Sequence, residues 1–276
     1  MSIASDMSAI HGLSDYHQDF LKLCDIHAPF RGKRVLEIGG HLPRAVVVDQ
    51  MGAARWTSIV ELSYYETVQH EDAIETHGAL SDLIRAEDLP PYGIYSGRAE
   101  QFPQSLDGQF DVILSIACFE HLDRLPLVLE RAHAALVPGG VLFSVFGPLW
   151  PYANGHHLHR VTDQAGNFFD FANSPVPFWG HLIMTPPEMY QHLLAHTDSQ
   201  AAAEIVYNLY HSPCINRLFC EDYMLYAQLS PFAQKNVLYS AGLAPPPEVL
   251  AALIARYPGR ERFNIDSMGL ILRKAD

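Results

Sequence analysis

Apolar and polar positions along the first part of the chain alternate between short apolar runs and longer amphipathic segments. Leu13 to His27 carries apolar residues at close to helical spacing and predicts a helix. Residues 34–38 (RVLEI) and 56–62 (WTSIVEL) predict buried strands. Between them, Pro43 can open a helix because its fixed φ suits the first turn, and Gly52 can end that helix.

The middle of the chain repeats this rhythm. Residues 110–115 (FDVILS) predict a strand, and Asp123 is placed to cap a helix that closes at residues 138–140 (PGG). Residues 141–146 (VLFSVF) predict the next strand. Strands that alternate with helices pair in parallel through crossovers, which indicates a doubly wound α/β sheet. Ligands bind such sheets at the carboxyl ends of the strands.

The pattern changes in the second half of the chain. Residues 148–180 predict an irregular loop rich in Pro, His, Asn and aromatics, and loops of this length are uncommon unless they carry a function. Thr185 predicts a helix N-cap, with Glu three residues later. Residues 204–210 (EIVYNLY) predict a strand, 214–257 are expected to be mostly helical, and 267–272 (SMGLIL) predict the last strand.

These elements predict a mostly parallel, seven-stranded sheet with an antiparallel last strand and a helical insertion. We expect an N-terminal helical cap (1–32), a cofactor-binding core (33–148), a substrate loop with a continuation of the sheet (149–212), a helical lid or dimer element (213–261) and the last strand (262–276).

Composition and charge narrow the classes of partner. The chain has 276 residues, 49% of them hydrophobic and 18% charged, as in an ordinary globular protein. The net charge of −13 argues against nucleic acid, because phosphate binding relies on clustered Lys and Arg. The four cysteines form no CxxC pair, which indicates reduced thiols and a cytoplasmic location. No apolar stretch reaches the roughly 18 residues that span a bilayer, so no membrane partner is expected. A homodimer is possible through the helical insertion.

A glycine turn follows the first predicted strand. Gly39 and Gly40 let the backbone turn sharply and approach a ligand without a Cβ in the way. Glu61 ends the next strand, where an acid can accept hydrogen bonds from both hydroxyls of a ribose. These two features would also serve a dinucleotide, but the turn lacks GxGxxG, which disfavours a nicotinamide enzyme.

Together with the segments at 110–115 and 138–141, these motifs resemble the class I, Rossmann-like S-adenosylmethionine-dependent methyltransferases over roughly residues 33–148. The resemblance implies S-adenosyl-L-methionine as cofactor and S-adenosyl-L-homocysteine as product. It implies that the glycine turn holds the methionine part, that Glu61 holds the ribose and that a loop at 97–103 (GRAEQFP) addresses the adenine. The cofactor-binding residues implied in this way are Glu37, Gly39, Gly40, His41, Glu61, Leu62, Ala99, Glu100, Ser115, Ile116 and His121.

The loop after the strand at 141–146 carries histidines at residues 156, 157 and 159. His156 and His157 are candidates for a general base or for substrate positioning, because the unperturbed pKa of histidine lies near 6.5. These histidines could also bind a metal with Asp163 and Asp170, but their spacing matches no structural zinc site, and we expect no metal. The candidates for substrate contacts are Tyr16, Trp150, Phe178 and Trp179.

The sequence therefore predicts a methyltransferase that transfers a methyl group to an oxygen, or less favourably a nitrogen, of a small-molecule metabolite. Two alternatives stay open. One is a methyltransferase-like fold that uses S-adenosylmethionine for a non-methylating step such as cyclisation, and the other is a non-catalytic binding module. Nothing in the sequence identifies the methyl acceptor.

Overall fold

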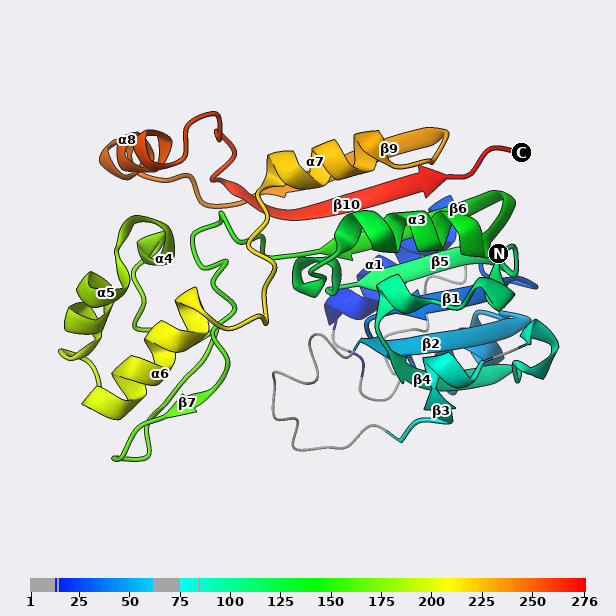
Figure 1. Cartoon of the computed structure of the whole chain (residues 1–276), viewed down its shortest axis with the longest axis horizontal. Coiled ribbons are helices and arrows are strands. Elements are labelled where there is room, and N and C mark those ends of the chain that lie inside the picture. The colour runs from blue at the N-terminus through cyan, green and yellow to red at the C-terminus, as the bar shows by residue number, and fades with distance from the viewer. Residues whose placement is uncertain (1–12, 14, 62–74, 84) are drawn as a thin grey trace.

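An eight-stranded sheet forms the centre of the part of the chain that the computed structural model describes, which is residue 13 and residues 15–61, 75–83 and 85–276. Its strand order is β3-β4-β2-β1-β5-β6-β10-β9. Figure 1 shows this sheet on one side of the molecule and a group of helices beside one end of it. The predicted cofactor residue Leu62 lies outside the described residues.

Six neighbouring strands of the sheet pair in parallel, and two further strands extend it through antiparallel pairs. The parallel strands are β1 (Arg34–Ile38), β2 (Arg55–Glu61), β3 (Gly78–Ala79), β4 (Tyr92–Gly97), β5 (Phe110–Ile116) and β6 (Leu136–Phe146). β10 (Ile265–Arg273) pairs antiparallel with β6, and β9 (Gln234–Ala241) pairs antiparallel with β10. A separate ribbon is formed by β7 (Val161–Thr162) and β8 (Phe168–Phe169). The predicted fold class, a mostly parallel α/β sheet with an antiparallel last strand, is confirmed.

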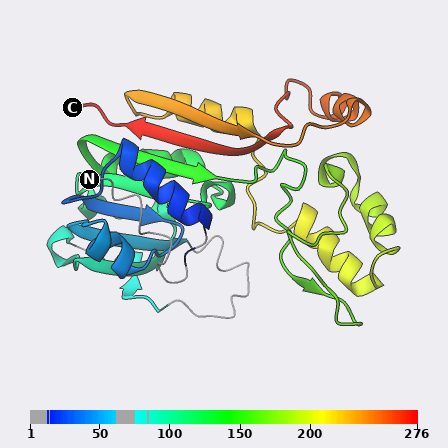
Figure 2. The same ribbon diagram turned by 180° about the vertical axis from the view of Figure 1, so that it is seen from behind.

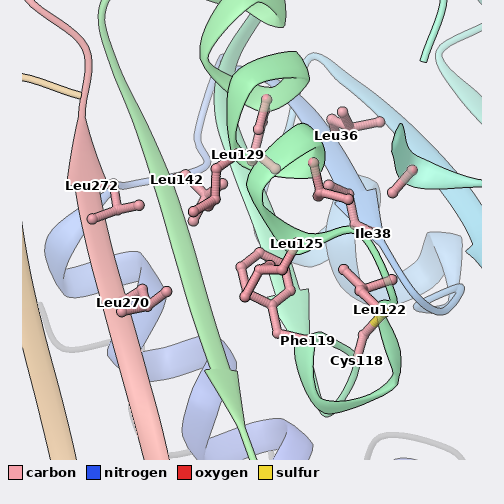
Figure 3. Packing of buried hydrophobic residues seen from close by; sticks show 14 of the residues in the cluster. Leu36, Ile38, Cys118, Phe119, Leu122, Leu125, Leu129, Leu142, Leu270 and Leu272 are labelled. Carbon is pink, nitrogen blue, oxygen red and sulfur yellow. The ribbon is translucent and has the colours of Figure 1, made fainter. Parts of the chain in front are cut away.

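Helices cover both faces of the sheet. On one face, α1 (Asp15–His27) and the π-helix η3 (Ala45–Gln50) pack against alternate residues of β1, β5 and β6. On the other face, α3 (Leu125–Ala135) and α7 (Cys220–Leu229) pack against the remaining alternate residues. Figure 2 shows α1 from the opposite side to that of Figure 1, and Figure 3 shows the core beneath α3. The central strands are buried on both faces, which explains why they appear in the sequence as continuous apolar runs.

The remaining helices lie beyond the carboxyl ends of the central strands (Figure 1). They are α4 (Gly180–Ile183), α5 (Pro186–Leu193), α6 (Ser199–Tyr210) and α8 (Pro247–Arg256). Short 3₁₀ turns occur at η4 (Leu80–Asp82), η5 (Ala86–Asp88), η6 (Ala99–Gln101), η7 (Gln104–Leu106) and η8 (Phe119–His121). In the described part of the chain, no helix has both the length and the apolar character needed to cross a membrane.

Two predictions for the second half of the chain were wrong. Residues 204–210 form the end of α6 instead of a strand, because Asp198 caps the helix by accepting the N–H groups of Gln200 and Ala201. The predicted helical stretch at 214–257 contains the strand β9, and the sheet has eight strands instead of the seven predicted. β9 is an edge strand whose mostly exposed, polar sequence gave no strand signal.

The boundary between α3 and β6 also differs from the prediction. Asp123 does not cap α3, since the N-cap is Arg124 and no side chain makes a cap hydrogen bond there. Residues 138–140 lie inside β6 and do not form a loop, because β6 begins at Leu136, opposite Phe110 of β5. Gly139 has φ +71° and donates its N–H to Ala275, so the glycines accommodate an irregular stretch of strand.

Candidate active site

A cavity of about 890 Å3 opens at the carboxyl ends of β1, β5 and β6. This is the edge at which open α/β sheets bind ligands, and the volume is in the range of ligand pockets. The described lining comes from α1, from the turn after β1, from residues 116–121 after β5, from residues 145–148 at the end of β6, from His157 and Phe171 of the following loop, and from Asp266 and Ser267 of β10.

The turn after β1 is held by the buried carboxylate of Glu37. Its oxygens accept hydrogen bonds from the Leu42 N–H (3.0 and 3.1 Å), the Trp56 Nε1 (2.8 Å) and the Ser58 Oγ (2.7 Å). Burial raises the pKa of Glu37, and the three sets of donors oppose this rise by favouring the ionised form. Glu37 also lines the cavity, so the residue expected to hold the cofactor holds the turn as well.

Gly39 and Gly40 lie at the cavity for different reasons. Gly39 has φ +108°, and a Cβ at this position would overlap the Cβ and Sγ of Cys118 after β5. The glycine is therefore needed for the close packing of the β1 and β5 turns, in addition to any approach of a ligand. At Gly40 a Cβ would meet nothing closer than a Glu37 oxygen at 3.4 Å. His41 is exposed and also lines the cavity.

The predicted ribose and adenine residues come together at the ends of β2 and β4. Glu61 is fully buried, and its Oε2 accepts the N–H of Ala99 at 2.7 Å. Glu100 follows on the same 3₁₀ turn and is half-buried. None of these three residues is among the described lining of the cavity. Ser115 donates its Oγ–H to the carbonyl of Ile38 at 2.9 Å, which links β5 to β1.

Two histidines face each other in the cavity wall, His121 after β5 and His157 in the loop after β6, with ring centroids 5.0 Å apart. The His157 Nε2 lies 2.6 Å from the Pro148 carbonyl, and the His121 Nδ1 lies 2.6 Å from the Cys214 carbonyl. Since a carbonyl only accepts, each of these nitrogens carries the hydrogen. In the neutral rings the lone pair therefore resides on Nδ1 of His157 and on Nε2 of His121.

Burial keeps these two rings neutral at pH 7. Desolvation lowers the pKa of His157 to about 4 and the pKa of His121 to about 3, although the hydrogen bonds to the carbonyls of Pro148 and Cys214 oppose both shifts. The neutral His157 ring can therefore accept a hydrogen bond or a proton at Nδ1, and it carries no positive charge until it takes up a proton.

His156 lies away from the described cavity lining. Its Nδ1 accepts the N–H of Leu158 at 3.1 Å, and its ring centroid lies 5.6 Å from that of His181. His181 in turn places its Nε2 2.8 Å from the Trp150 carbonyl. His156 and His181 thus belong to the internal packing of the loop, and of the two predicted catalytic histidines the structure brings only His157 to the cavity.

Among the predicted substrate contacts, the structure brings Tyr16 of α1 to the cavity. Trp150 and Trp179 are buried in a separate core, where the Trp179 Nε1 donates to the carbonyl of Phe263 at 3.0 Å. Phe178 is 59% exposed and lies outside the lining. None of the described lining residues comes from 213–261, the segment predicted as a lid or dimer element, whereas α1 contributes three.

Glu120, which lies directly before His121, was not among the predicted site residues. Its side chain is almost fully buried, lines the cavity and accepts the N–H of Gly147 at 3.1 Å. Burial raises its pKa to about 8. The signal available in the sequence was an acid inside the apolar segment at 116–122 (IACFEHL), where a charged side chain has little access to water.

The acids that could have completed a metal site hold local turns instead. Asp163 accepts the backbone N–H of Ala165 and Asn167, and Asp170 accepts those of Ala172 and Asn173. Among the described residues, no group of three or more His, Cys, Asp or Glu side chains is arranged to hold a metal ion.

Comparison with known proteins gives one family match. A family model described as a methyltransferase domain matches residues 10–198, which is more than half of the chain. No curated protein matches the chain.

Solved structures similar to this chain share little sequence with it. A candidate S-adenosylmethionine-dependent methyltransferase from Listeria monocytogenes has 13% identity and a TM-score of 0.49, with 95% of this chain and 100% of that chain covered. An S-adenosylmethionine-dependent methyltransferase from Mesorhizobium loti has 14% identity and a TM-score of 0.44, with coverage of 92% and 96%. A candidate methyltransferase from Haloferax volcanii, solved in complex with the activator Trm112, has 16% identity and a TM-score of 0.46, with coverage of 95% and 91%.

The buried histidines predict how stability depends on pH. The folded-state pKa of His181 is lowered to about 4 by burial, so the unfolded chain takes up protons first as the pH falls. The stabilisation from this neutral ring is complete above pH 6.5 and is lost as the pH falls towards 4. Between pH 6.5 and 5, His181→Gln should remove about 1.5 kcal/mol of the pH-dependent decrease in the free energy of unfolding.

Urea unfolding of the wild type and the variant at the two pH values measures this difference. The control is His196→Gln, which removes an exposed histidine instead of a buried one. Equal pH dependence in the wild type and His181→Gln would show that the buried ring does not titrate abnormally.

Proposed function

We propose that this chain, which belongs to the methyltransferase domain family, takes a methyl group from S-adenosylmethionine and transfers it to an oxygen, or less favourably a nitrogen, of a small molecule bound in the cavity. The observation that carries this proposal is the cavity at the ends of β1, β5 and β6, whose described lining contains Glu37, Glu120 and Asp266 but neither Lys nor Arg. When bound, the cofactor supplies the electrophilic methyl carbon.

The charges of the cavity fit this cofactor. A sulfonium is a cation, and it is favoured beside carboxyl groups and disfavoured beside Lys, Arg or charged histidine. His121 and His157 are neutral at pH 7 because burial lowers the pKa of each. The lining therefore presents no competing positive charge from these two rings.

We assign the cofactor-binding roles to the strand ends. The turn at Gly39 and Gly40 would hold the methionine part, and Glu61 would hold the ribose. The bond from the Ala99 N–H to Glu61 ties the proposed adenine loop to the proposed ribose acid. A carboxylate offers about four acceptor positions, so this bond is compatible with further hydrogen bonds from ribose hydroxyls.

His157 is the proposed proton acceptor. The bond from its Nε2–H to Pro148 orients the ring, so the proton of the attacking group would go to Nδ1. A base with a pKa of about 4 is weak, but a hydroxyl oxygen becomes strongly acidic once it is methylated, so a weak base is sufficient to remove its proton. Most of the catalytic effect would come from in-line alignment of acceptor and donor.

Removal of the Glu61 carboxylate tests the cofactor site. Glu61→Ala should weaken binding of S-adenosylhomocysteine by about 10- to 100-fold, the scale of a hydrogen bond to a charged group. Isothermal titration calorimetry measures the affinity, and Glu130→Ala, which removes an exposed carboxylate from α3, is the control. An unchanged affinity in a folded Glu61→Ala protein would show that Glu61 does not hold the ribose.

Replacement of His157 and of His156, one at a time, tests which of the two histidines takes part in catalysis. With an acceptor found by screening for release of S-adenosylhomocysteine and a methylated product, His157→Gln should lower turnover by about a hundredfold or more. His156→Gln should have a much smaller effect, because His156 lies outside the described lining. With acceptor and cofactor both saturating, the wild-type turnover should stay level between pH 6 and 8 and fall only as the pH approaches 4.

Affinity for S-adenosylhomocysteine should be unchanged in both histidine variants. Near-normal turnover of His157→Gln would remove this residue from the mechanism. Release of a product that carries no new methyl group would instead indicate a non-methylating use of the cofactor.

A further inference from the structure

One carboxyl oxygen in the cavity wall has no partner in the described structure. The Glu120 side chain is 1% exposed, and its Oε1 accepts the N–H of Gly147. Its Oε2 is buried and makes no hydrogen bond with any described residue. A buried polar atom of this kind costs free energy unless a ligand supplies the missing hydrogen bond.

The turn that carries Glu120 is fixed from behind. Asn216 donates its backbone N–H to the Glu120 carbonyl at 2.9 Å, and its Nδ2 donates to the carbonyls of Phe119 and Leu122. The hydroxyl of Tyr223 in α7 donates to the Asn216 Oδ1 at 2.9 Å. Because these bonds hold the backbone on both sides of Glu120, its orientation towards the cavity is built into the fold.

The surroundings of Glu120 suit a positively charged group. Asp266 lines the same cavity, the two facing histidines are neutral, and the described lining contains neither Lys nor Arg. Aromatic rings of Tyr16 and Phe171 also line it, and aromatic faces attract cations. An anionic group here would meet carboxyl groups and no described counter-charge.

We propose that the Glu120 Oε2 binds a protonated amino group of the methyl acceptor, so that the acceptors of this enzyme are amine-bearing small molecules rather than anionic ones. This inference rests on the proposed function. An ammonium nitrogen has no lone pair, so the atom that receives the methyl group is a different atom of the same molecule, placed near His157.

The methionine part of the cofactor also carries a protonated amino group, which is a second ligand group of the kind that a carboxylate binds. Glu37 and the turn at Gly39 and Gly40 lie at the end of β1, where the methionine part is proposed to bind. Glu120 lies after β5, with its Oε1 bonded to Gly147 at the end of β6, next to His121. We therefore assign its Oε2 to the acceptor side of the cavity, whose wall also contains His157.

Binding of an ammonium requires the ionised form of Glu120, which gives the interaction a pH dependence. Burial raises the pKa of Glu120 to about 8, so below pH 8 the carboxyl group must release a proton to bind the cation. The affinity should therefore rise about tenfold from pH 6 to pH 7 and level off above pH 8.

Four other titratable groups around Glu120 have pKa values outside this range. Cys118 on its own turn and Tyr223 of α7 have pKa values raised well above their usual ones by burial. His121 and His157 have pKa values lowered to about 3 and 4. Burial also raises the pKa of Asp266 in β10 above the ordinary value of an aspartate side chain.

The test uses the full chain saturated with S-adenosylhomocysteine and three probes of similar size, 2-phenylethylamine, 2-phenylethanol and 3-phenylpropanoate. Titration followed by NMR should show the amine binding at least about tenfold more tightly than the alcohol, with the carboxylate weakest. Glu120→Gln keeps the shape of the side chain and should lower amine affinity about tenfold or more. Glu130→Gln, on the exposed face of α3, should change none of these affinities.

Several results would overturn the inference. Equal binding of amine and alcohol to the wild type would do so, and so would a pH-independent amine affinity between pH 6 and 8, which needs no variant. Loss of S-adenosylhomocysteine affinity in Glu120→Gln with amine binding intact would assign the carboxyl group to the cofactor. Failure of the wild type to bind S-adenosylhomocysteine would instead contradict the proposed function itself.

Discussion

The burial of an ionisable carboxyl group at the end of β1 is the constraint on which the cavity depends. Removing Glu37 from water is costly unless donors replace the lost hydration, and Leu42, Trp56 and Ser58 supply them. These bonds tie the turn after β1 to β2. Gly39 then packs directly on Cys118, which ties the same turn to the end of β5. The floor of the cavity is therefore set by internal contacts before any ligand binds, and such preorganisation reduces the cost of binding.

The second consequence of burial is electrostatic. Desolvation disfavours charge on both acids and bases, so the histidines of the cavity lose their positive charge at pH 7, and the pKa of Glu120 rises towards the physiological range. A cation entering the cavity reverses this effect at Glu120, because it stabilises the ionised carboxylate. The same low-dielectric surroundings thus leave Glu120, His121 and His157 nearly neutral at pH 7, and in our proposal they favour positively charged ligands.

The elements buried on both faces were predictable from the sequence, as β1 at residues 34–38 shows, because burial leaves a continuous apolar run. The edge strand β9 was not predictable, since one side of it faces solvent and its sequence is polar. α6 was misassigned because its β-branched and aromatic residues outweighed a helix cap that lies before them. In the site, the end of β1 and the loop after β6 predicted Gly39 and His157, and both line the cavity. Trp150 and Trp179 were misassigned because tryptophan suits a core as well as a substrate wall. The proposed role of Glu120 depends on its burial and its neighbours, which the sequence does not display.

A crystal structure of the protein with S-adenosylhomocysteine tests the central claim most directly. The account predicts that the homocysteine part lies against Gly39 and Gly40, that the ribose hydroxyls bond to Glu61 and that the sulfur faces the part of the cavity lined by Glu120 and His157. A nucleoside bound away from Glu61, or a sulfur turned away from His157, would contradict it.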